Sequence, residues 1–152
     1  MDTATSIALG KIGGAAVLAL SAFGSALGVG YAGLSSIGAW KKCFAQNKPA
    51  PFIQLTVCIG AAITQTFYGM IVMTVKLLKM ASNDPSTWPA IIGWGIFGGM
   101  AIGLSAIMQG KVAAAAADAF AETGQGFTNY LMALGIIESV AIFVMVFILV
   151  FA

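Results

Sequence analysis

The sequence predicts an all-α membrane protein with four transmembrane helices, arranged as two tandem helical hairpins. Apolar residues make up 60% of the 152 residues and charged residues only 8%, whereas about a quarter of a soluble domain is charged. Four apolar stretches each exceed the ~20 residues that a helix needs to cross a bilayer core. The two halves of the chain also resemble one another.

The four stretches are separated by short connections rich in polar residues, Pro and Gly. Short connections make consecutive helices antiparallel neighbours. The first connection holds the tightest lysine cluster, which favours a cytoplasmic location for it. The stretches run from about Ile12 to Trp40, Phe52 to Leu78, Pro89 to Ala121, and Phe127 to the C-terminus.

The halves align with nearly constant shifts. A shift of 80 residues sets Ser25 opposite Ser105 in the first and third helices, and a shift of 73 sets Gln65 opposite Glu138 in the second and fourth. The shared helix order indicates a parallel duplication. We expect a first hairpin over residues 1–80, with Gln65 in place of an acid, and a second over 81–152 that carries Glu138.

Glycines one helical turn apart favour close packing of helix backbones, because no side chain intervenes. Packing within one chain and an inner ring of helices from several chains both explain this pattern. The second and fourth helices are bulkier, and we expect Phe143, Met145, Phe147 and Ile148 to face lipid. The glycines are Gly24, Gly28, Gly95, Gly99 and Gly103.

Glu138 lies near the middle of the last helix. A charged side chain at mid-bilayer costs about 2.5–3.5 kcal/mol on insertion scales, so such a residue is a functional candidate by default. The alternative is a protonated glutamate that only joins helices. Thr64, Gln65 and Tyr68 share one helix face, and Gln109 lies on the third helix.

Each of these four side chains also has an ordinary structural explanation, as a helix-internal hydrogen bond or a packing contact. Their convergence near one carboxylate favours a site, and hard cations prefer oxygen ligands. The backbone carbonyl of Ala61 is one turn from Gln65 and is a further candidate ligand. Lys111 follows Gln109 by two residues and therefore points away from Glu138.

Other chemistry is excluded or left open. All seven cations are lysines, histidine is absent, and the net charge of +2 without a basic run implies no nucleic-acid partner. Cys43 and Cys58 have no metal-type spacing. Asp118 and Glu122, four residues apart, form either a solvated helix end or a docking surface for a soluble partner. The chain has no nucleotide-binding motif.

The chain resembles the duplicated proteolipid of V-type rotary ATPases, called the c or K subunit, over essentially its whole length. TQ-x-x-YG (64–69), QGKVAAA (109–115) and the mid-helix Glu138 carry the resemblance. It implies a non-catalytic subunit without a cofactor, of which identical copies form a membrane ring. The ring rotates against a stator membrane subunit, and a central-stalk subunit meets its cytoplasmic loops. ATP hydrolysis in an attached head drives the rotation.

The resemblance is closest to bacterial sodium-transporting members, which implies a bacterial plasma membrane and Na⁺ as the carried ion, with H⁺ as the alternative. It implies one ion per four helices. Ala61 departs from the side chain of those members, but a backbone ligand tolerates this. The implied ion-binding set is Glu138, Gln65, Thr64, Gln109 and the Ala61 carbonyl, with Tyr68 hydrogen-bonded to Glu138.

Two other classes remain open. A small four-helix antiporter would carry its essential acid in the first helix, which has none. A structural ring-forming membrane protein would need no polar cluster around Glu138.

Overall fold

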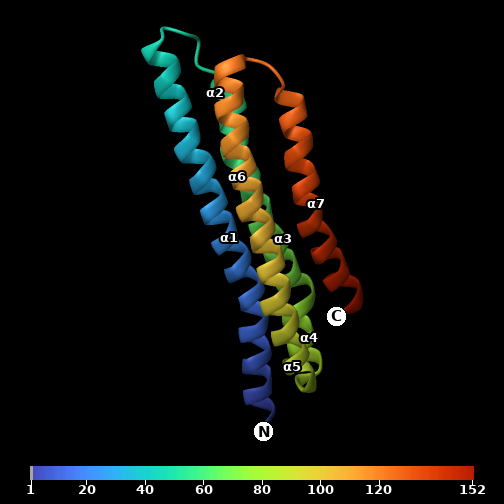
Figure 1. Ribbon diagram of the computed structural model, residues 1–152. Helices are drawn as coiled ribbons and strands as arrows, with labels where there is room; N and C mark the ends of the chain where they lie inside the picture. Colours follow the sequence, from blue (N-terminus) through green and yellow to red (C-terminus); the bar gives the residue numbers. More distant parts are fainter. Residues whose placement is uncertain (1) are drawn as a thin grey trace.

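The computed structural model describes residues 2–152, and within this range the regular structure is entirely helical. Four long helices lie side by side as a bundle (Figure 1). Each is long and apolar enough to cross a membrane. The prediction of an all-α protein with four membrane-spanning helices is therefore confirmed.

The first span is α1 (Thr3–Ala45) and the fourth is α7 (Phe127–Phe151). The two middle spans contain short non-α turns. The second span consists of α2 (Phe52–Gly60), the 3₁₀ turn η1 (Ala61–Ile63), α3 (Thr64–Ile71), the π-helical η2 (Val72–Leu77) and α4 (Leu78–Asn83). The third consists of η3 (Pro85–Thr87), α5 (Trp88–Gly93), the π-helical η4 (Trp94–Gly98) and α6 (Gly99–Thr123).

The connections have local causes. Gly124 and Gly126 adopt left-handed backbone conformations, with φ of 66° and 81°, which glycine reaches without steric cost. Between the second and third spans, Asp84 accepts hydrogen bonds from the hydroxyl and the backbone N–H of Ser86. These two bonds lower the pKa of the Asp84 carboxyl. Asp84 is also the one non-helical residue between α4 and η3, so the break between the hairpins lies there.

The first and third spans run parallel to each other. Ser35 donates a hydrogen bond to the carbonyl of Ala114, 79 residues further on, and Lys42 pairs with Glu122, 80 residues further on. Each part of α1 thus lies beside the segment that the 80-residue shift aligns with it. The N-terminus, the C-terminus and the second connection lie at one end of the bundle (Figure 1), and the other two connections lie at the opposite end.

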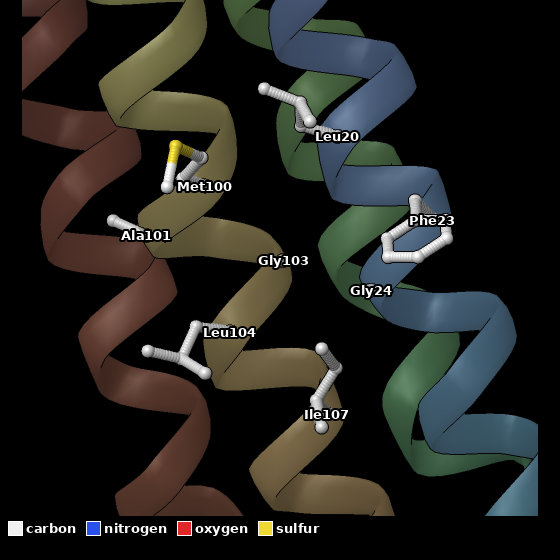
Figure 2. Close-up of a pocket in the computed structure, with 8 residues that line it drawn as sticks. All are labelled: Leu20, Phe23, Gly24, Met100, Ala101, Gly103, Leu104 and Ile107. Carbon is white, nitrogen blue, oxygen red and sulfur yellow. The ribbon is translucent and has the colours of Figure 1, made fainter.

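Glycines allow the backbones of α1 and the third span to approach closely. Figure 2 shows Gly24 and Gly103 among larger apolar side chains of the two helices. Together these residues line an apolar groove of about 450 Å³. All five predicted packing glycines make their close contacts within this chain, which accounts for their spacing; contacts between copies stay a prediction. The pairs are Gly24 with Gly103, Gly28 with Ala106, Gly95 with Gly13, and Gly99 with Val17.

The fourth span is apolar over most of its surface, and only one side packs on the bundle. Phe143 and Phe147 are exposed, as expected for side chains that meet lipid. Ile148 is only 1% exposed and belongs to a core cluster with Val72, so its predicted lipid-facing position is wrong. Met145 is partly buried against the same cluster. The C-terminal half of this helix has only apolar side chains after Ser139, so its sequence pattern does not show that Ile148 packs inward.

Candidate ion-binding site

The second span contributes a group of oxygen atoms where a 3₁₀ turn meets α3. The hydroxyl of Thr64 lies 3.2 Å from the carbonyl oxygen of Ala61 and 3.2 Å from Oε1 of Gln65. A hydroxyl has one proton, so these two oxygens are alternative acceptors for it. The structure therefore gathers one carbonyl, one hydroxyl and one amide oxygen at the start of α3.

Two buried amides connect this group to the third span. Nε2 of Gln65 donates to Oε1 of Gln109 across 2.6 Å. Both side chains are almost completely buried, with exposed fractions of 0% and 1%. A buried amide without a partner is costly, so this bond also stabilises the contact between the two hairpins.

The carboxylate of Glu138 accepts hydrogen bonds from two different spans. Tyr68 donates to Oε1 across 2.6 Å, and Nε2 of Gln109 donates to Oε2 across 3.3 Å. The second hydrogen of the same Gln109 nitrogen points to the carbonyl of Leu134, at 3.1 Å. Glu138 is half-buried and lies near the middle of α7.

The side chains named by the sequence analysis thus form one continuous network. Thr64 contacts Gln65, Gln65 donates to Gln109, and Gln109 donates to one carboxylate oxygen of Glu138, while Tyr68 donates to the other. An ionised carboxylate only accepts hydrogen bonds, and hydrogen bonds are stronger in surroundings of low dielectric constant. The network therefore suits a negative charge at Glu138.

The ligands near Glu138 are of one chemical kind. Within residues 2–152, no group of three or more His, Cys, Asp or Glu side chains comes together. The single carboxylate contacts the Tyr68 hydroxyl and the Gln109 amide, and the network behind Gln109 adds the Gln65 amide, the Thr64 hydroxyl and the Ala61 carbonyl. Oxygen atoms of these kinds are the ligand class of hard cations.

Sequence reasoning missed two participants. The carbonyl of Leu134 accepts from Gln109, and Ser105 donates to the carbonyl of Ile137 across 2.9 Å, directly before Glu138 in the chain. The 73-residue shift already pairs Leu134 with Ala61, so that signal was available. Ser105 stood out only as a marker of the internal repeat.

The lysine of the third span takes no part in the network. The Lys111 amine lies 5.7 Å from the centroid of the Tyr31 ring, a cation–π contact. Among the residues that the structure describes, Lys42 and Glu122 form the only ion pair. The predicted orientation of Lys111 away from Glu138 is confirmed, whereas the pairing of Glu122 with Lys42 was not predicted.

Comparison with known families adds one finding. Residues 92–151 match the family of the C subunit of ATP synthase. The matched segment runs from α5 to the end of α7 and includes Gln109 and Glu138, but it covers fewer than half of the residues. It supports a c-type proteolipid, a non-catalytic multi-pass membrane protein that forms oligomeric rings and takes part in ion translocation. No curated protein matches the chain significantly.

Proposed function

We propose that this protein is a rotor-ring subunit of a V-type ATPase, which binds one cation per chain at Glu138 and carries it across the membrane as the ring rotates. ATP hydrolysis by partner subunits drives the rotation. The observation that carries the proposal is the hydrogen-bonded network that joins both hairpins at a mid-membrane carboxylate. The family match over the second hairpin supports it.

The V-type assignment depends on the first hairpin. The internal repeat aligns Gln65 with Glu138, so the first hairpin has an amide where the second has a carboxylate. The Gln65 amide bonds to Gln109 and so belongs to the same hydrogen-bond network as Glu138. One carboxylate then serves four helices. Fewer ions per turn of the ring suit ATP-driven pumping better than ATP synthesis.

Sodium is the favoured ion because the site offers more oxygen atoms than a proton requires. A proton needs one carboxylate and an acceptor, whereas a sodium ion needs several oxygens that replace its hydration shell. The terminal torsion of glutamine is broad, so the amides of Gln65 and Gln109 can rotate to present oxygen to the ion. The Thr64 hydroxyl and the Ala61 carbonyl complete the set. The proton is the alternative ion.

The proposed partners follow from the rotor role. They are identical copies in a ring, a stator membrane subunit, a central-stalk subunit at the cytoplasmic connections, and lipid. A bacterial plasma membrane is the proposed location, with the first connection in the cytoplasm.

The test is carbodiimide labelling of Glu138 in membranes that contain the assembled ATPase. Carbodiimide attacks the protonated carboxyl, and bound sodium competes with protonation. Sodium should therefore slow the labelling, and more strongly at higher pH, where fewer protons compete. Gln109→Leu and Thr64→Val should weaken this protection and leave Glu138 reactive. Thr56→Val is the matched control, because the exposed Thr56 hydroxyl bonds only to its own helix.

Two results would count against the proposal. If millimolar sodium gives no protection at any pH and transport runs unchanged without it, the coupling ion is the proton. If labelling of Glu138 leaves ion-coupled ATPase activity intact, the rotor assignment fails, and the antiporter and the structural ring protein become the better explanations.

A further inference from the structure

Ser105 forms a bond next to Glu138 that none of the proposed ion ligands shares. Its side chain is only 6% exposed, and its hydroxyl donates to the carbonyl of Ile137 across 2.9 Å. Gln109, one turn further along α6, donates to the carbonyl of Leu134. Two side-chain-to-backbone bonds therefore connect α6 to the turn of α7 that directly precedes Glu138.

These two bonds differ in what ion loading would do to them. The Gln109 nitrogen serves both Leu134 and Glu138. When the amide rotates to present its oxygen to a cation, it releases both. The Ser105 hydroxyl bonds to neither Glu138 nor another proposed ligand, so ion loading does not require its bond to α7 to break.

We infer that Ser105 is a positioning residue for the ion site, whose hydroxyl fixes the rotation and height of α7 and thereby the place of the Glu138 carboxylate. The inference rests on the proposed function. Binding groups need to be held within about 0.5 Å of their productive positions. Side chains that exchange partners during transport cannot supply that constraint, whereas Ser105 can.

The first hairpin contains a matched control. Ser25 is the counterpart of Ser105 under the 80-residue shift, and it is equally buried, with 3% exposed. Among the described residues, however, its hydroxyl has no hydrogen-bond partner. Ser25→Ala and Ser105→Ala thus remove the same atom from equivalent places, but only the second removes a bond.

The experiment measures carbodiimide labelling of Glu138 in the assembled complex, as a rate without sodium and as the sodium concentration that halves this rate. Ser105→Ala should label faster, because α7 is freer to move, and should need about two- to tenfold more sodium, as expected for one lost hydrogen bond. Ser25→Ala should match the wild type. Ser105→Thr should restore both values. It keeps the hydroxyl, and its methyl group has room in a groove of about 440 Å³ that Ser105 lines with Leu104 and Met108.

The outcomes separate this inference from the proposed function. If Ser105→Ala behaves like Ser25→Ala in both measurements, or if Ser105→Thr restores neither, the positioning role is wrong while sodium binding stands. If the wild type shows no sodium protection, the sodium proposal is wrong, and the labelling rates alone decide the role of Ser105. Should Ser105→Ala fail to assemble, Ser105→Cys replaces it; its weaker donor should give intermediate rates, and a wild-type rate would contradict the inference.

Discussion

Tyr68 donates a hydrogen bond to Glu138 across 2.6 Å, although 70 residues separate the two in the chain. The bond joins the second span, which belongs to the first hairpin, to the fourth span, which belongs to the second hairpin. The other carboxylate oxygen accepts from Gln109, on the third span. Three of the four spans thus meet at one carboxyl group, which ties its position to the docking of one hairpin on the other.

Replacing Tyr68 with phenylalanine should weaken ion binding without preventing it. Hydrogen bonds to charged groups contribute about 1.5–3 kcal/mol, so Tyr68→Phe should raise the sodium concentration that half-protects Glu138 by about tenfold or more. Tyr31→Phe is the control, because Tyr31 lies against Lys111 and its ring is retained. Equal protection in both variants would contradict a role for the Tyr68 hydroxyl.

Glu138→Gln should abolish transport and leave assembly intact. Glutamine keeps the shape of the side chain and can accept a hydrogen bond from Tyr68, but it cannot bind and release a positive charge. Ion-coupled ATPase activity and carbodiimide labelling should be lost, while native gels should still show the ring. Wild-type turnover in this variant would remove Glu138 from the mechanism.

The sequence predicted the members of the site because polar side chains within a membrane are few and need partners. Gln65, Gln109 and Glu138 are amide and carboxyl side chains far from the helix ends, where such groups are few, and helical spacing placed them on inward faces beside Thr64. Their convergence in the structure therefore follows from a simple physical constraint. The identity of the ion does not, because the same oxygens can serve a sodium ion or surround a protonated carboxyl.

Other features of the fold depend on packing that no local pattern encodes. The orientation of the two glutamine amides depends on which neighbour each meets. The bond from Ser105 to Ile137 requires a specific register of α6 against α7. The burial of Ile148 has the same origin, since the end of α7 has only apolar side chains and its contacts decide which of them turn inward.

The ion pair between Lys42 and Glu122 should contribute modestly to stability, in a salt-dependent way. Both side chains are about half exposed, and water and salt screen such pairs. Lys42→Gln should lower the Tm of the purified chain slightly at low salt, and the difference should disappear at high salt. Lys41→Gln, one residue away, is the control. If Lys42→Gln and Lys41→Gln give the same Tm at low salt, the pair has no stabilising role.

Gly24→Ala should weaken the packing of one hairpin on the other, because a Cβ at this position would meet the backbone carbonyl of Gly103, and a backbone has no rotamer with which to move aside. Overpacking a close contact costs about 1–3 kcal/mol, so the Tm of the purified chain in detergent should fall by several degrees. Gly30→Ala, on the same helix, is the control: no atom lies within 4 Å of its Cβ position, and alanine is the better helix former. Its Tm should therefore equal or exceed the wild-type value.

A Gly24→Ala chain as stable as Gly30→Ala would show that α1 and α6 do not approach each other through Gly24 and Gly103. The hydrogen bond between Tyr68 and Glu138 depends on the packing of the first hairpin against the second, and it would then need another explanation.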